Sequence, residues 1–174
     1  DFRLSDSDYQ RTLGVNADWV HQLTTNTAVL TNLYTSALRY PEAGGNIRDI
    51  NQYIGHVGLQ ITDNAFTHTV GLLLGDEDAP RNAGNHNARG FTAAYYHARF
   101  DISSEHQIFG RIYLQDSHQL GEDPTFLTTR DDLMTQLTMG YAWQLDKHWR
   151  WKSELGYTDS DSDIDSDTDP CRGI

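Results

Sequence analysis

Apolar and polar side chains alternate along several stretches of this chain. In residues 133–145 the odd positions are mostly large and apolar, whereas the even positions from Gln136 to Gln144 are small or polar. In residues 149–158 the odd positions carry Trp, Trp, Ser, Leu and Tyr, and the even positions carry Arg150, Lys152 and Glu154. A period of two predicts β-strands with one apolar face. Because the opposite face is charged, it has to lie against water.

The same period occurs in four earlier stretches, which we also interpret as strands: 12–19, 52–62, 89–100 and 108–115. Residues 28–40 alternate poorly, and we assign them to a strand mainly by their position between two others. Together the stretches predict about eight antiparallel strands. The same composition of one apolar and one polar face is expected for each.

Short and long connections alternate between these stretches, with a repeat of about 40 residues. Strands of roughly 10–14 residues have the length that a tilted strand needs to cross a bilayer. Tight turns at one end and long loops at the other are typical of up-and-down outer-membrane barrels. We therefore predict an all-β, antiparallel up-and-down meander over residues 1–158 that forms a transmembrane β-barrel or part of one. The short turns are 24–27, 63–66, 103–106 and 146–149, and the long connections are 41–50, 76–87 and 117–131.

Aromatic residues gather near the predicted strand ends. Such rings favour the depth of the lipid headgroups and form two girdles around membrane barrels, although aromatics are also good strand formers in soluble proteins. A β-propeller also repeats at this period, but only two long strands fit each repeat here and no Gly-His…Trp-Asp signature recurs. The girdle candidates are Trp19, Tyr40, Tyr53, Phe66, Phe91, Trp143, Trp149, Trp151 and Tyr157.

The composition of the chain limits the classes of partner that we expect it to bind. Lys+Arg 13 against Asp+Glu 25 gives a net charge of −12, and no basic run exists, so we expect no nucleic-acid partner. No apolar stretch is long enough for a transmembrane helix. The lone Cys171 cannot form an internal disulfide. Residues 1–5 lack the features of a signal peptide, and we interpret the chain as an excerpt of a longer protein.

Histidines and acidic residues offer no recognisable metal motif. We expect His56 and His97 on the wet face together with Arg99, and most of the others in turns or loops. Residues 159–169 carry six carboxylates at alternate positions but lack the glycine and closing glutamate of a calcium loop. We therefore predict a solvated, disordered acidic tail over 159–174, and neither a metal nor a cofactor. The other histidines are His21, His68, His86, His106, His118 and His148.

Two predicted loops contain acids, a serine and histidines that could serve a barrel hydrolase. Their convergence cannot be predicted from spacing, and no Gly-x-Ser-x-Gly motif is present. We therefore predict no enzymatic activity and assign no catalytic residue. The candidates for the alternative are Asp76, Glu77, Asp78, His86, Asp116, Ser117, His118, Glu122 and Asp123.

Two segments, 121–132 and 154–164, carry a family resemblance, supported by 39–41 and 49–53. They resemble the C-terminal β-barrel of the surface lipoprotein assembly modifier family, in which tetratricopeptide repeats precede the barrel. The resemblance implies a barrel in the outer membrane of a Gram-negative bacterium, in contact with lipid, that helps a lipoprotein client reach the cell surface. It ends after Ile164, where further strands are expected, so the barrel is interpreted as truncated.

Three alternatives stay open from the sequence. The first is a small pore or adhesion barrel that closes at eight strands. The second is a barrel hydrolase that uses the loop acids and histidines. The third is a soluble periplasmic β-domain, for which a calcium response is conceivable from the acidic tail.

Overall fold

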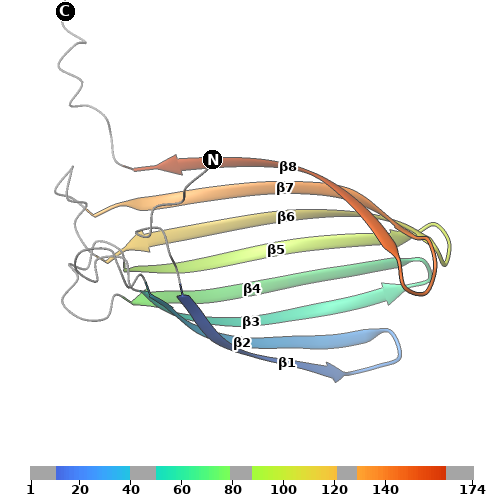
Figure 1. Ribbon diagram of the computed structural model, residues 1–174, viewed down its shortest axis with the longest axis horizontal. Helices are drawn as coiled ribbons and strands as arrows, with labels where there is room; N and C mark the ends of the chain where they lie inside the picture. Colours follow the sequence, from blue (N-terminus) through green and yellow to red (C-terminus); the bar gives the residue numbers. More distant parts are fainter. Residues whose placement is uncertain (1–10, 40–49, 79–87, 121–128, 164–174) are drawn as a thin grey trace, which may run out of the picture.

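The computed structural model describes residues 11–39, 50–78, 88–120 and 129–163, which form one antiparallel sheet (Figure 1). Its strands pair in chain order, from β1 to β8. Within the described residues, no helix is long and apolar enough to cross a membrane. The predicted meander of about eight strands is confirmed. The strands are β1 (Arg11–Gln22), β2 (Thr27–Arg39), β3 (Ile50–Asp63), β4 (Phe66–Asp78), β5 (Arg89–Asp101), β6 (His106–Gln119), β7 (Asp131–Gln144) and β8 (Arg150–Ser162).

Tight turns join β1 to β2, β3 to β4, β5 to β6 and β7 to β8 at one end of the sheet, which we call the short-turn end. Backbone hydrogen bonds close them, for example from Ile102 N to His106 O at 2.9 Å and from Leu145 N to Trp149 O at 2.9 Å. In the two-residue turn after β3, Asn64 has a φ of 51°. Asparagine tolerates this left-handed conformation better than most residues.

The opposite, long-loop end differs from prediction, because several strands run further than their composition indicates. Residues 76–78 continue β4, residues 117–119 continue β6, and residues 159–162 continue β8. Each extension is paired: Glu77 lies opposite Arg89, and Asp161 lies opposite Leu133. Ladder hydrogen bonds and cross-strand partners thus outweigh the low strand propensity of acidic residues. The predicted tail loses its first residues to β8, and its remainder from 164 lies outside the described residues.

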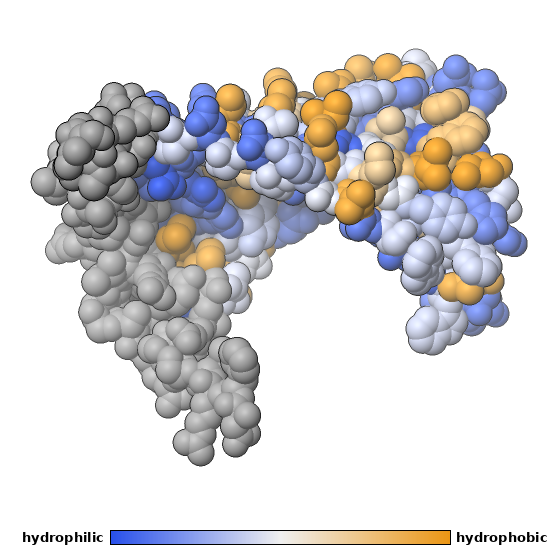
Figure 2. Space-filling view, turned by 90° about the horizontal axis from the view of Figure 1, so that it is seen from above, coloured by the Kyte–Doolittle hydropathy of each residue, from blue (hydrophilic) through white to orange (hydrophobic). Residues whose placement is uncertain are grey.

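The sheet is a single curved layer. Two side-chain contacts skip a strand on one face: His56 Nε2 in β3 lies 2.8 Å from Tyr95 Oη in β5, and Arg150 Nη2 in β8 donates to Gln107 Oε1 in β6 at 2.7 Å. Side chains from alternate strands can meet only on a concave face. The arched outline, with apolar residues along its outer edge, is visible in Figure 2.

The convex face is apolar and uncovered. Leu137, Met139 and Trp143 keep 45%, 63% and 39% of their surface exposed, so no second protein layer lies over β7. Among the described residues, the buried apolar side chains are all alanines. A large apolar side chain left in water lacks the stabilisation of about 1.5–3 kcal/mol that burial would provide. A single layer cannot bury this face against itself. The convex face therefore requires an apolar surrounding, which does not favour the soluble alternative.

The sheet is open. Within the described residues, β1 pairs only with β2 and β8 only with β7, so these two strands form the edges (Figure 1). A sheet that spans lipid cannot leave the backbone groups of its edge strands unpaired. Closure at eight strands, which the small-barrel alternative requires, is not observed.

Candidate functional site on the concave face

The concave face carries the polar half of the alternating pattern. The strand register brings the even positions of β1–β3 together with the odd positions of β4–β6 and the even positions of β7 and β8. This is the wet face that alternation predicts. Strand β2 alternates poorly in sequence. The register nevertheless divides its residues between the two faces and places the large side chains of Leu30 and Tyr34 on the inner face, opposite Gly58 and Ile54.

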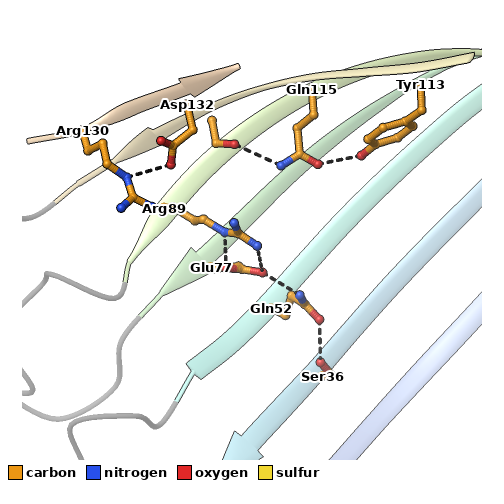
Figure 3. Close-up of polar contacts among 9 residues, drawn as sticks. Ser36, Gln52, Glu77, Arg89, Tyr113, Gln115, Arg130 and Asp132 are labelled. Carbon is orange, nitrogen blue, oxygen red and sulfur yellow. Dashed lines mark hydrogen bonds and ion pairs between the residues drawn. The ribbon is translucent and has the colours of Figure 1, made fainter. Parts of the chain in front are cut away.

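A polar row crosses four strands near the long-loop end (Figure 3). Arg89 donates twice to Glu77, from Nε to Oε2 at 2.6 Å and from Nη2 to Oε1 at 3.3 Å. Gln52 Nε2 also donates to Glu77 Oε1, at 2.7 Å, and Ser36 Oγ donates to Gln52 Oε1 at 3.2 Å. Glu77 is only 7% exposed. These charge-assisted bonds satisfy a buried carboxylate and link β2 to β5.

A second polar series follows β6 at the same end (Figure 3). Tyr113 Oη donates to Gln115 Oε1 at 2.7 Å, and Gln115 Nε2 donates to Ser117 Oγ at 3.0 Å. Nearby, Arg130 Nε lies 2.9 Å from Asp132 Oδ2. Side-chain hydrogen bonds therefore run between and along the strands on the concave face at the long-loop end.

Glycines leave room for rings on the concave face. Tyr95 lies over Gly71, where an added Cβ would be 2.7 Å from Tyr95 Cζ. Phe91 lies over Gly75 in the same manner. Phe91 therefore faces inward, and its assignment to a lipid-facing girdle is wrong. Its odd position on β5 follows the register of the charged Arg89 rather than that of the apolar face.

Most other girdle candidates lie on the convex face or in a turn. Trp19, Tyr53, Phe66, Trp143, Trp151 and Tyr157 belong to the outward register. Trp149 lies in the turn before β8 and is 71% exposed. Tyr40 lies outside the described residues.

The histidine predictions are partly confirmed. His56 and His97 lie on the concave face with Arg99, as expected. The expected loop and turn positions of two others are wrong, because His106 begins β6 and His118 lies inside it. His106 stacks on Trp143 with ring centroids 5.7 Å apart. Over the described part of the chain, no group of three His, Cys, Asp or Glu residues could hold a metal ion.

The hydrolase candidates that the structure describes are divided between the two faces of the sheet. Ser117 faces inward and is bound by Gln115, whereas the next residue, His118, faces outward and contacts Asp131. Glu77 is held by Arg89 on the concave face. Asp76, Asp78 and Asp116 belong to the outward register. Glu122, Asp123 and His86 lie outside the described residues.

At the short-turn end the concave face is cationic. Arg99, Arg111, Arg150 and Lys152 line a cavity of about 370 Å³ between β5 and β8. Sequence reasoning missed this cluster and also the row from Ser36 to Arg89. Their signal was the parity of each residue within its strand, which becomes a spatial cluster only when the pairing register is known.

Two solved structures show the same architecture. Both are of OmpT (in-vitro folded), an outer membrane protein of Vibrio cholerae, the second in trimer form. The first has a TM-score of 0.60 at 14% identity and the second 0.57 at 13%. The fold is that of an outer-membrane β-barrel. The match covers 90% of this chain but 47% and 48% of the two structures, so the chain spans about half the length of the barrels it matches.

No protein-family model matches the sequence, and no curated protein does. The resemblance to the surface lipoprotein assembly modifier family is therefore not established as membership. The matched region corresponds to about half of each barrel, and within the described residues β1 and β8 are the edges of the sheet.

Proposed function

We propose that this sheet is a wall of a hydrated barrel in the bacterial outer membrane, and that the barrel serves the export or display of lipoproteins without enzymatic chemistry. The observation that carries the proposal is the opposition of two faces on one layer. The convex face offers Leu, Val, Ile and Trp side chains to lipid, and the concave face offers hydrogen-bonding and charged groups to water.

A hydrated wall suits the passage of a polar segment. Along β6 the inward positions are Gln107, Phe109, Arg111, Tyr113, Gln115, Ser117 and Gln119, of which only Phe109 lacks a polar group. A polypeptide that moves along such a wall can exchange hydrogen bonds with it at every step. The lipid anchor of a lipoprotein, in contrast, would need contact with the apolar convex face or with an open edge.

The client assignment rests on the sequence resemblance in 121–132 and 154–164. The absence of an enzymatic step in the proposal rests on the separation of Ser117 from His118 on opposite faces of β6. Both inferences depend on the outer-membrane barrel fold but not on each other.

A pore for small solutes is the second candidate. It is favoured by the polar lining that continues from the Ser36–Arg89 row to the cationic cavity, because that lining needs no client to account for it. The two functions predict different defects in a strain that lacks the gene.

The test compares a deletion strain with strains that carry the wild-type gene or an Arg111→Gln variant. Surface lipoproteins are measured by protease accessibility on intact cells, and solute entry by uptake of a small hydrophilic sugar. Loss of surface lipoprotein with unchanged uptake supports export. Unchanged lipoprotein display with slower uptake refutes export and supports the pore, and an unchanged phenotype in both assays refutes both.

A further inference from the structure

Four cationic side chains converge on the concave face at the short-turn end, in a chain whose net charge is −12. Arg99 comes from β5, Arg111 from β6, and Arg150 and Lys152 from β8. They line one cavity of about 370 Å³, a volume at the small end of ligand sites. Elsewhere in the described strands, Arg and Lys residues are sparse.

The fold brings these side chains together across β7. Opposite Gln107, Phe109 and Arg111 this strand contributes the small residues Ala142, Gly140 and Thr138 to the inner surface, so side chains of β8 can reach β6 over it. Phe109 occupies the space above Gly140, where an added Cβ would be 2.8 Å from Phe109 Cε2. The result is a cavity with an aromatic floor and cationic walls.

The charges in the cavity are not balanced. Lys152 pairs with Glu154 at 2.9 Å, and Arg99 lies 3.2 Å from Asp101. The other two guanidinium groups contact neutral amides. Arg111 donates to Gln136 Oε1 at 3.0 Å, and Arg150 donates to Gln107 Oε1 at 2.7 Å.

Among the described residues, neither Arg111 nor Arg150 forms an ion pair with a carboxylate, so the cavity keeps an excess of positive charge. Each guanidinium has five N–H donors, and its planar fork matches carboxylate and phosphate oxygens. Both groups therefore retain donors for an additional acceptor.

We propose that this cavity binds a small multivalent oxyanion that bears carboxylate or phosphate groups. Arg111 and Arg150 supply the donors, Lys152 adds charge, and Glu154 opposes the ligand by repulsion and by holding Lys152. Lys152 Nζ also lies 4.8 Å from the centroid of the Phe109 ring, within the range of a cation–π contact. The site depends on the barrel fold and not on the nature of the exported client.

The experiment is calorimetric titration of the protein extracted from outer membranes in detergent, at low ionic strength. Citrate probes the carboxylate class and tripolyphosphate the phosphate class. We expect saturable binding of at least one probe. Arg111→Gln and Arg150→Gln should each weaken it about tenfold, since a hydrogen bond to a charged group is lost. Glu154→Gln should tighten it several-fold, by about the same electrostatic reasoning.

Arg130→Gln is the matched control, because it removes the same charge at the opposite end of the sheet and should leave affinity within about twofold. The proposal is overturned if neither probe binds saturably to the wild type, or if Arg130→Gln weakens binding as much as the cavity variants. Failure of Glu154→Gln to tighten binding also overturns it. That last variant gains affinity, so damage to folding cannot mimic its expected result.

Discussion

Replacing Arg89 by Met isolates the energetic contribution of the polar row. The change keeps most of the aliphatic stem but removes the guanidinium that makes two hydrogen bonds to Glu77. The Glu77 side chain is 9% exposed and the Arg89 side chain 44%, so a nearly buried carboxylate loses its cationic partner. Breaking a fully buried pair costs about 3–5 kcal/mol. Because Arg89 is half-exposed and Gln52 still donates to Glu77, we expect about 2 kcal/mol here.

The assay is reversible denaturant unfolding of the protein folded into lipid vesicles, followed by tryptophan fluorescence. A double-mutant cycle adds Glu77→Gln, which removes the charge that Arg89→Met exposes. The double variant should be destabilised less than the sum of the single variants, by about 1 kcal/mol. Lys152→Met is the control. Its ion pair with Glu154 is 50% and 46% exposed, so its loss should change the free energy of unfolding by less than about 1 kcal/mol.

Two results would refute this reasoning. The first is an Arg89→Met variant whose stability lies within about 0.5 kcal/mol of the wild type. The second is strict additivity of Arg89→Met and Glu77→Gln. Either outcome would mean that Glu77 reaches water or another donor in the folded barrel.

Three further predictions concern the two faces and a turn, and the same unfolding assay checks each. Gly140→Ala should destabilise by about 1–3 kcal/mol because its Cβ would lie 2.6 Å from a backbone oxygen, whereas Gly110→Ala, with 3.7 Å to its nearest atom, should be nearly neutral. Leu137→Arg, on the convex face, should lower the free energy of unfolding in lipid by about 2–4 kcal/mol, whereas its control Thr158→Arg, on the concave face, should lower it less. Equal losses for the two variants would contradict the lipid-facing assignment of Leu137. Asn64→Val should cost about 1 kcal/mol or more at a φ of 51°, whereas Asn64→Gly should be tolerated.

The sequence determined the kind of fold. In β7, for example, Leu137 and Met139 alternate with Gln136 and Thr138, and a period of two assigns each residue to a face before any pairing is known. The tight turns also follow from local chemistry, as at Asn64. Alternation and turn spacing are local properties, so both survive without tertiary information. They sufficed for the meander, its approximate strand number and the wet position of His56 and His97.

Only the tertiary structure decided which polar residues meet. The cross-strand register brings the carboxylate of Glu77 to the guanidinium of Arg89. Arg111 and Arg150 line the same cavity because the intervening strand β7 places small side chains between them. The register also extends β4 and β8 into acidic residues and places the Phe91 ring on the inner face, although the preferences of these residues predict neither. Pairing energy is spread over whole strands, so it overrides the preference of single residues. The sequence therefore predicts the fold and the polar face, but not which residues of that face contact one another.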